Sequence, residues 1–146
     1  MIRPARADDR PRIEAIVEAA YSPYLQRMNR KPAPMVDDYA KRIAAGQTHV
    51  LEEDDEIVGL LVLEPGEGFL LLDNVAVDPG HHGKGHGSRL MAFTEEEARR
   101  QGFDVVELYT NEVMVENIAR YRHLGYVEMK RERVAGYDRV YMRKTL

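Results

Sequence analysis

Residues 69–91 read FLLLDNVAVDPGHHGKGHGSRLM, an apolar strand pattern, a glycine-rich stretch and the start of a helical pattern in one run. The first amides of a helix have no partner within the helix and point along its axis. Gly83, Gly85 and Gly87 let a ligand approach the backbone closely, while the helix dipole and Lys84 add positive charge. The run therefore predicts a phosphate or pyrophosphate site, and the alternative is a flexible turn with no ligand.

Two nucleotide-binding motifs do not fit this run. The nucleoside-triphosphate loop requires G-x-x-x-x-G-K-[ST], whereas Lys84 precedes Gly85 and no Gly-Lys-Ser or Gly-Lys-Thr occurs in the chain. The dinucleotide fingerprint G-x-G-x-x-G also fails, because the glycines stand at alternate positions and no early strand–helix–strand unit precedes them. Both of these nucleotide-binding classes are excluded.

The rest of the chain alternates between strand and helix patterns, with Pro and Gly between them. We expect a mixed α/β fold with a largely continuous sheet, in the order βααβββαβαββ, and a single domain over residues 1–146. The expected strands are 2–6, 48–52, 57–63, 69–77, 104–109 and two that flank Ala135-Gly136. The first expected helix begins after Asp8-Asp9, and Pro23 should end or kink it. The other expected helices span residues 36–45, 87–100 and 113–124.

Composition narrows the class of protein. The 146 residues carry a net charge of −4, no cysteine and no apolar run long enough to cross a membrane. These features disfavour nucleic-acid or membrane partners and exclude disulfides and thiolate catalysis. The N-terminal residues MIRPARADDR lack the apolar segment of a secretory signal, so we expect a cytoplasmic protein.

Two motifs carry a family resemblance. Val75-Ala76-Val77-Asp78-Pro79, followed by residues 82–90, resembles the acyl-coenzyme A loop of the GNAT N-acetyltransferase superfamily, whose pattern is [QR]-x-x-G-x-[GA] after a strand. Tyr121-x-x-x-Gly125-Tyr126 resembles the Tyr-x-x-x-Gly-Phe ending of that family, and the expected element order is the family order. His82 stands where the family has Gln or Arg.

The resemblance implies acetyl-coenzyme A as co-substrate, no metal, and transfer of the acetyl group to a primary amine by direct attack. The strand interrupted by Asp73-Asn74 should be irregular, which would leave main-chain groups free for the pantetheine arm. The implied coenzyme-binding residues are Val75, Ala76, Val77, His82, Gly83, Lys84, Gly85, His86, Gly87, Ser88 and Asn117.

The resemblance makes Tyr121 the general acid for the leaving thiolate. A phenol suits this step because it is neutral at physiological pH yet can protonate a thiolate. The alternative is a half-buried helix aromatic that only packs under the sheet. Many family members carry Asn seven positions before the tyrosine, but Met114 stands there, and Asn117 either substitutes for that residue or is simply exposed.

Asp73 is the candidate general base. An aspartate inside an apolar strand must be solvated, paired with another group, or used in catalysis. Its alternatives are an ion pair with one of the arginines, or a water route to bulk that makes a base unnecessary. Strict alternation would place Leu71, Asp73, Val75 and Val77 on one face, beside the backbone expected to hold pantetheine.

The resemblance places the acceptor near the first two helices, which points to Tyr21, Tyr24 and Arg27. These side chains would suit a small molecule with a carboxylate, and the acceptor is either a small-molecule amine or a protein amine. The same rim could instead pack on a second copy of the chain in a homodimer. Two alternative functions remain: a catalytically silent acyl-coenzyme A sensor or binding subunit, and a simple phosphate-binding domain.

Three histidines, His81, His82 and His86, lie within six residues. The four-residue spacing of His82 and His86 could ligate a metal if this segment were helical. We expect the loop not to be helical that early and no local residue to complete a ligand set, so no metal site is predicted.

Overall fold

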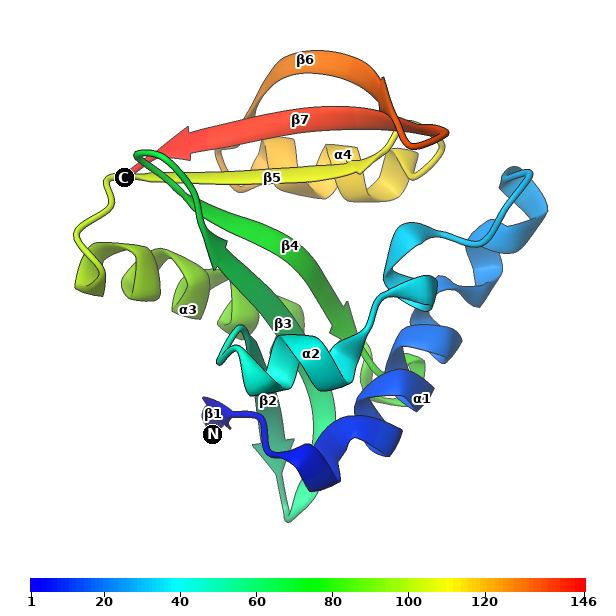
Figure 1. Ribbon diagram of the computed structural model, residues 1–146, viewed down its shortest axis with the longest axis vertical. Helices are drawn as coiled ribbons and strands as arrows, with labels where there is room; N and C mark the ends of the chain where they lie inside the picture. Colours follow the sequence, from blue (N-terminus) through cyan, green and yellow to red (C-terminus); the bar gives the residue numbers. More distant parts are fainter.

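A single mixed sheet runs through the protein, and it is built from seven strands: β1 (Ile2–Pro4), β2 (Thr48–Glu53), β3 (Glu56–Pro65), β4 (Leu70–Val77), β5 (Val105–Asn111), β6 (Val127–Val134) and β7 (Tyr137–Thr145). The structure, a computed structural model, describes all 146 residues. The strand order is β1-β2-β3-β4-β5-β7-β6 (Figure 1). β4 and β5 are parallel and the other neighbours are antiparallel.

Four α-helices pack on the sheet: α1 (Arg10–Tyr21), α2 (Tyr39–Ala44), α3 (His86–Arg100) and α4 (Val115–His123). α1 and α2 cover one face, and α3 and α4 cover the other (Figure 1). The α-helices and strands follow each other as βααβββαβαββ, so the mixed α/β fold and its element order are confirmed. None of the helices is both long and apolar enough to span a membrane.

Local signals explain where the first two helices start and stop. Asp38 accepts a hydrogen bond from the amide of Lys41 at 3.1 Å and so caps α2, which begins three residues later than expected. α1 ends just before Pro23, which has no amide hydrogen to continue the helical ladder. The chain then continues through residues 22–27 as a 3-10 helix.

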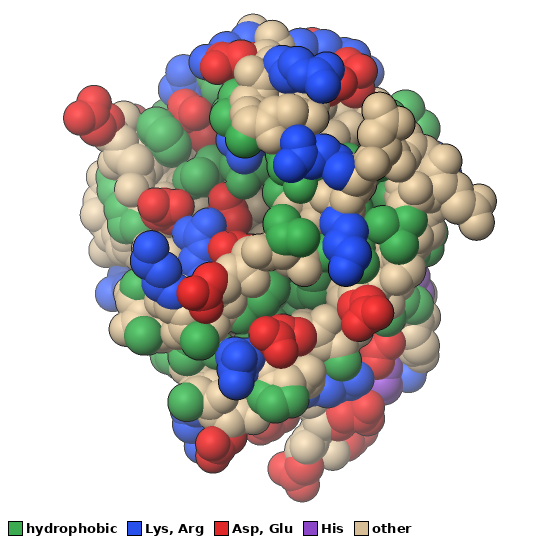
Figure 2. All heavy atoms as spheres, turned by 45° about the vertical axis from the view of Figure 1, so that its right-hand side comes forward, with side chains coloured by type: hydrophobic (Ala, Val, Ile, Leu, Met, Phe, Trp, Pro, Cys, Tyr) green, Lys and Arg blue, Asp and Glu red, His purple; other side chains and the backbone are tan.

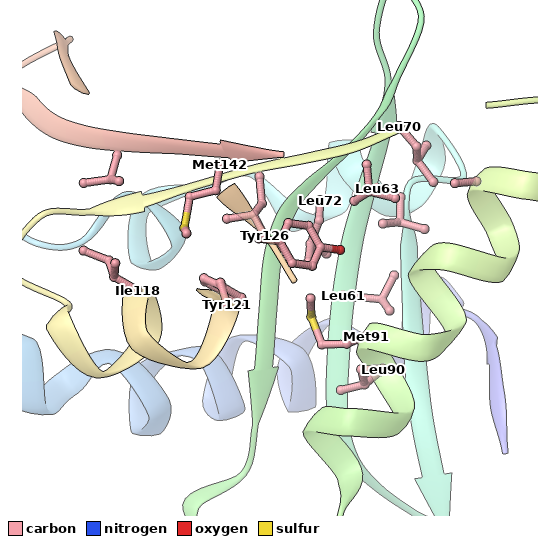
Figure 3. Packing of buried hydrophobic residues seen from close by; sticks show 14 of the residues in the cluster. Leu61, Leu63, Leu70, Leu72, Leu90, Met91, Ile118, Tyr121, Tyr126 and Met142 are labelled. Carbon is pink, nitrogen blue, oxygen red and sulfur yellow. The ribbon is translucent and has the colours of Figure 1, made fainter. Parts of the chain in front are cut away.

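The core consists of one apolar cluster on each face of the sheet. The cluster under α3 and α4 includes Met91 of α3 together with Ile118 and Tyr121 of α4 (Figure 3). The cluster under α1 and α2 includes Ile13, Ile16 and other side chains of α1. Both faces of β3 are therefore buried, which explains its unbroken apolar sequence.

β4 contains a bulge at Asp73. Val62 of β3 pairs with Asn74, whereas the next residue, Leu63, pairs with Leu72. Asp73 consequently has no partner on β3, and the regular alternation of faces along β4 is interrupted. The irregularity expected at Asp73-Asn74 is confirmed.

The bulge makes one expectation wrong, because Leu71, Asp73, Val75 and Val77 do not share a face. Val75 and Val77 pack against the cluster under α3 and α4. Asp73 instead binds Arg42 of α2, which lies on the opposite face. One extra residue in a strand shifts every later side chain to the other face.

β4 also separates from β5 halfway along its length. The two strands pair only over residues 70–72 and 106–108. Figure 1 shows them diverging beyond this point, with β5 continuing alongside β7. From Asp73 to Val77, the edge of β4 that faces β5 therefore has no strand partner.

A buried polar network holds the diverging part of β4 against the two N-terminal helices. The hydroxyl of Tyr21 donates to Asn74 Oδ1 at 2.6 Å, and Asn74 Nδ2 donates to the hydroxyl of Tyr39 at 3.1 Å. Tyr39 in turn donates to the carbonyl of Pro34. Asn74 thus joins β4, α1, α2 and the segment before α2 through satisfied hydrogen bonds.

Replacing Asn74 with Ala should destabilise the fold by about 1–3 kcal/mol, because the variant removes the two buried hydrogen bonds that Asn74 makes with the hydroxyls of Tyr21 and Tyr39. Urea unfolding followed by circular dichroism measures the change. The matched control is Asn29→Ala at an exposed position, which we expect to stay within about 0.5 kcal/mol of the wild type. Equal midpoints for the two variants would show that the network does not stabilise the fold.

Candidate active site

The loop between β4 and α3 presents free backbone amides at the start of α3. Gly83 and Gly85 both have φ of +80°, a conformation that residues with a Cβ rarely adopt. The Arg89 amide donates to the Gly85 carbonyl at 3.1 Å, so the amides of residues 86–88 precede the helical ladder. A Cβ at either glycine would meet no atom within 4 Å, which leaves the space beside this turn open to a ligand.

A cleft of about 480 Å³ lies at this end of α3, and we call it the α3 cleft. Its lining residues are Ala20, Tyr21, Tyr24, Val75, Ala76, Val77, His81, His82, Gly83, Gly85, His86, Gly87, Ser88, Met91, Asn117, Arg120, Tyr121, His123 and Leu124. Four of the five histidines of the chain and one arginine line the cleft, but no Asp or Glu does. In a protein of net charge −4, this lining together with a helix N-terminus favours an anionic ligand.

The histidines of the loop have separate environments. His82 Nε2 lies 3.3 Å from the carbonyl of Val77, at the end of β4. His86, the first residue of α3, is only 7% exposed. His82 precedes the first residue of α3, and the two side chains do not share a helical face as a metal pair would.

One cluster of possible cation ligands is formed by Glu56, Asp78 and His81, and its histidine also lines the α3 cleft. Arg12 donates to Asp78 at 2.7 Å and lies 3.5 Å from Glu56. Its guanidinium therefore already neutralises the two carboxylates of the cluster.

A second, smaller cavity of about 40 Å³ lies behind the α3 cleft, and we call it the inner pocket. Its lining residues are Tyr21, Met28, Pro32, Ala33, Pro34, Leu72, Asp73, Asn74, Val75, Tyr109, Thr110, Asn111, Met114, Asn117, Tyr121, Tyr137 and Arg139. The space exists because β4 and β5 separate after Leu72, and residues 28–34, which we call the strap, cover it.

The two cavities share four lining residues, Tyr21, Val75, Asn117 and Tyr121. Tyr21 comes from α1, Val75 from the free part of β4, and the other two lie one turn apart on α4. A ligand that entered from the α3 cleft and a second one in the inner pocket would therefore meet at these side chains.

Tyr121 stands at this meeting point in an apolar environment. Its ring packs edge-on against Tyr126 with centroids 6.1 Å apart, within the core cluster of α3 and α4 (Figure 3). Burial raises the pKa of Tyr121 to about 12. The hydroxyl is therefore a neutral proton donor over the whole physiological pH range.

Asp73 lines the inner pocket and is both buried and paired. Its carboxylate accepts a hydrogen bond from the hydroxyl of Tyr109 at 2.7 Å and lies 3.3 Å from Arg42. Arg42 also binds Asp37 and Glu64, so three carboxylates share one guanidinium. Burial raises the pKa of Asp73, although the Tyr109 hydrogen bond and Arg42 act in the opposite direction.

The residues expected at the acceptor have three different positions. Tyr21 lines both cavities, and its hydroxyl is bound to Asn74. Tyr24 lines the α3 cleft but not the inner pocket. Arg27 lines neither cavity, because its guanidinium is bound to Glu116 at 2.8 Å and so braces the strap side of the molecule against α4.

Sequence reasoning missed Asn74, Tyr109 and Arg139 as lining residues of the inner pocket. The only signal was alternation along β7, where Val140 and Met142 face the core and Arg139 faces the other side. Nothing in that alternation shows that the other side is a pocket rather than solvent.

One face of the molecule has mixed charge (Figure 2). Figure 2 shows acidic and basic side chains interspersed on one face, without a broad patch of one sign. Exposed ion pairs such as Arg10–Glu14, Lys130–Glu132 and Arg133–Asp138 contribute little to stability individually. This face therefore lacks the basic surface that a nucleic acid would need.

The protein is thus a mixed α/β protein with a cleft suited to an anion at a helix N-terminus, beside two strands that separate. The sequence matches the acetyltransferase (GNAT) family over residues 13–126. The chain therefore belongs to the GNAT acetyltransferase family, and the resemblance found in its motifs is confirmed.

Solved structures share the whole fold. The chain is similar over its full length to the PaiA N-acetyltransferase of Thermoplasma acidophilum in complex with coenzyme A, with a TM-score of 0.82, 16% identity and 98% of that chain covered. It is also similar to the ribosomal-protein-alanine N-acetyltransferase of Brucella melitensis, with a TM-score of 0.74, 25% identity, and coverage of 100% of this chain and 99% of the other.

A third similar structure is YncA of Salmonella typhimurium, a putative acetyltransferase with its cofactor acetyl-CoA. The TM-score is 0.75, the identity 22%, and the match covers 100% of this chain and 93% of the other. No curated protein sequence matches the chain significantly.

The pH dependence of stability should reveal the buried charge of Asp73. A pKa raised by burial means that the folded protein holds this proton more tightly than the unfolded chain does. Asp73 therefore weakens the folded state as pH rises above the usual carboxyl range. We expect Asp73→Asn to gain stability relative to the wild type between about pH 4 and about pH 7, measured from urea midpoints.

Asp78→Asn is the control, because its stability relative to the wild type should change in the opposite direction. The Arg12 guanidinium holds the pKa of Asp78 below its usual range, so this carboxylate contributes stability that is present above the usual carboxyl pKa and lost as pH falls. The Asp78→Asn variant should therefore be less stable than the wild type throughout that interval, and the difference should shrink as pH falls below the usual carboxyl pKa. A change of the same sign in both variants would contradict the environment described for Asp73.

Proposed function

We propose that the protein is an acetyl-CoA-dependent N-acetyltransferase that transfers the acetyl group to a primary amine by direct attack in a ternary complex. The observation that carries this proposal is the meeting of the α3 cleft and the inner pocket at Tyr21, Val75, Asn117 and Tyr121. Two substrates, one in each cavity, would have their reacting atoms brought together there.

The α3 cleft suits coenzyme A along its length. The free amides of residues 86–88, with Gly83, Gly85 and the nearby Lys84, would hold the pyrophosphate. The unpaired edge of β4 from Val75 to Val77 would bind the amides of the pantetheine arm as a neighbouring strand does. A cleft of about 480 Å³ is within the usual size of a ligand site.

The side chains at the meeting point supply the proton transfers. The amine must be neutral to attack, and the C–N bond forms as the C–S bond breaks. Tyr121 donates its proton to the departing sulfur, and Asp73, on the inner-pocket side, receives the surplus proton of the amine. Burial raises the pKa of Asp73, which makes its carboxylate a stronger base than an exposed one. Asn117 would hold the coenzyme beside Tyr121.

The family and the similar structures support this class of reaction. Two of these structures carry coenzyme A or acetyl-CoA, and another is named for acetylation of a ribosomal-protein alanine. A cytoplasmic location forms part of the proposal, because the co-substrate is available there. Release of free thiol from acetyl-CoA across a panel of amines tests the reaction directly, and binding without release with any amine would favour the silent sensor.

The glycine turn before α3 gives a sharp test of coenzyme binding. Gly85→Ala forces a Cβ into a left-handed conformation and into the open space of the α3 cleft. We expect about a tenfold or larger loss of acetyl-CoA affinity by calorimetry. Lys84→Ala should lose less, because it removes only one exposed and screened charge.

Gly46→Ala is the matched control, because Gly46 has φ of +72°, meets no atom within 4 Å of its built Cβ and lies outside both cavities. It should lose about 1–2 kcal/mol of stability, as Gly85→Ala does, and keep its acetyl-CoA affinity. A greater loss of affinity in Lys84→Ala than in Gly85→Ala would show that side-chain charge, not the backbone, dominates the site.

Tyr121→Phe should lower turnover by roughly 10–100-fold and leave acetyl-CoA affinity nearly unchanged. Phe keeps the ring packed on Tyr126 and deletes only the acidic hydroxyl. Tyr126→Phe is the control, because its hydroxyl is buried without a partner and lies outside both cavities. Wild-type turnover in a folded Tyr121→Phe variant would remove Tyr121 from the mechanism, and equal losses of affinity and turnover would make it a binding residue.

A further inference from the structure

Arg139 has an unusual electrostatic environment for this protein. Four arginines are partly buried: Arg3, Arg12, Arg42 and Arg139. The first three each lie within ion-pair distance of two or three carboxylates. Arg139 forms no ion pair, although a guanidinium is rarely left partly desolvated without a carboxylate.

The contacts that Arg139 does make hold it in place without neutralising it. Its guanidinium carbon lies 3.9 Å from the centre of the Tyr109 ring, and Nη1 donates to the hydroxyl of Tyr141 at 3.2 Å. Its Nε is buried and has no hydrogen-bond partner. A guanidinium has five N–H donors, so the side chain retains the capacity to bind an anion in the cavity that it lines.

Arg139 and Asp73 are the only charged side chains that line the inner pocket, and Tyr109 lies between them. The hydroxyl of Tyr109 donates to Asp73, and the guanidinium of Arg139 stacks on the face of the Tyr109 ring. A small molecule in the pocket would therefore meet a carboxylate and a guanidinium separated by one side chain. This pair of opposite charges matches a ligand that carries both an amine and a carboxylate.

The strap forms one wall of the inner pocket and is held in place at both ends. Arg30 donates to the carbonyl of Ala135, and Tyr137 donates to the carbonyl of Lys31 at 2.7 Å, so the β6–β7 turn holds the strap down. Tyr39 holds its other end at Pro34. The inner pocket is small, about 40 Å³, and stays open to solvent on one side, so it would hold the charged head of a small molecule rather than a length of polypeptide.

We propose that the acceptor is a small primary amine that carries a carboxylate, such as a free amino acid, with Arg139 binding the carboxylate and Asp73 facing the amine. This inference rests on the proposed function and names its substrate class. Arg139 is then the residue that selects the substrate, because an amine without a carboxylate would leave its guanidinium unpaired in the pocket.

The first test needs only the wild-type protein. Each protein amino acid is compared with its own amide as acceptor, with thiol release from acetyl-CoA as the readout. For the accepted side chains, we expect kcat/KM to be about 100-fold higher for the acid than for the amide. Equal rates for acid and amide, or reaction only with amines that lack a carboxylate, would overturn the inference while leaving the acetyltransferase proposal intact.

The second test asks whether Arg139 causes the preference for the acid over the amide. Arg139→Gln should reduce the ratio of acid to amide to below about fivefold, mainly through a higher KM for the acid. Arg139→Lys should recover part of the ratio, because it restores the charge without the bidentate geometry. The control is Arg133→Gln on β6, an exposed arginine paired with Asp138, which should keep the wild-type ratio. A ratio that persists in folded Arg139→Gln would overturn the role of Arg139.

Binding separates failure of the inference from failure of the proposed function. Calorimetric titration of the accepted amino acids into protein saturated with coenzyme A should show binding that Arg139→Gln weakens by the same factor. Amino-acid binding that depends on Arg139 but no thiol release with any amine would refute the proposed acetyl transfer and support the site. Thiol release with carboxylate-free amines and no amino-acid binding would refute the site alone.

Discussion

The separation of β4 from β5 after three paired residues is the constraint on which the site depends. A bulge at Asp73 turns the strand, and the buried amide of Asn74 holds the turned part against α1 and α2. A fully paired sheet would have closed the space between the strands and used the edge of β4 for its own ladder. Because the strands separate, one opening serves two cavities that meet in the middle of the molecule.

The distribution of charge follows the same division. The chain is acidic overall, yet the α3 cleft has no acidic lining residue and ends at the exposed amides of a helix. On the other side of the separated strands, three carboxylates surround Arg42, and Asp73 is the one that reaches the inner pocket. One side of the meeting point therefore suits an anion, and the other suits an amine with a second, anionic group near Arg139.

Buried polar groups around the two cavities oppose stability and would serve the proposed proton transfers. Burial raises the pKa of both Asp73 and Tyr121, which makes the first a better base and keeps the second protonated. A partly buried arginine without a carboxylate adds a further cost to the folded state. The two apolar clusters that enclose the sheet supply the stability that lets these groups persist.

The sequence by itself determined the element order, the glycine turn at Gly83 and Gly85, and Tyr121 as a candidate acid, because strand and helix periods and glycine turns depend on neighbouring residues. Only the tertiary structure decided which face Asp73 occupies, since one bulged residue reverses the alternation that sequence reasoning assumes. It also decided the partners of Asp73, which come from α2 and β5. The tertiary structure also decided that Arg139 of β7 lines the inner pocket. Contacts between residues far apart in the chain depend on how strands and helices pack, and local patterns carry no record of that packing.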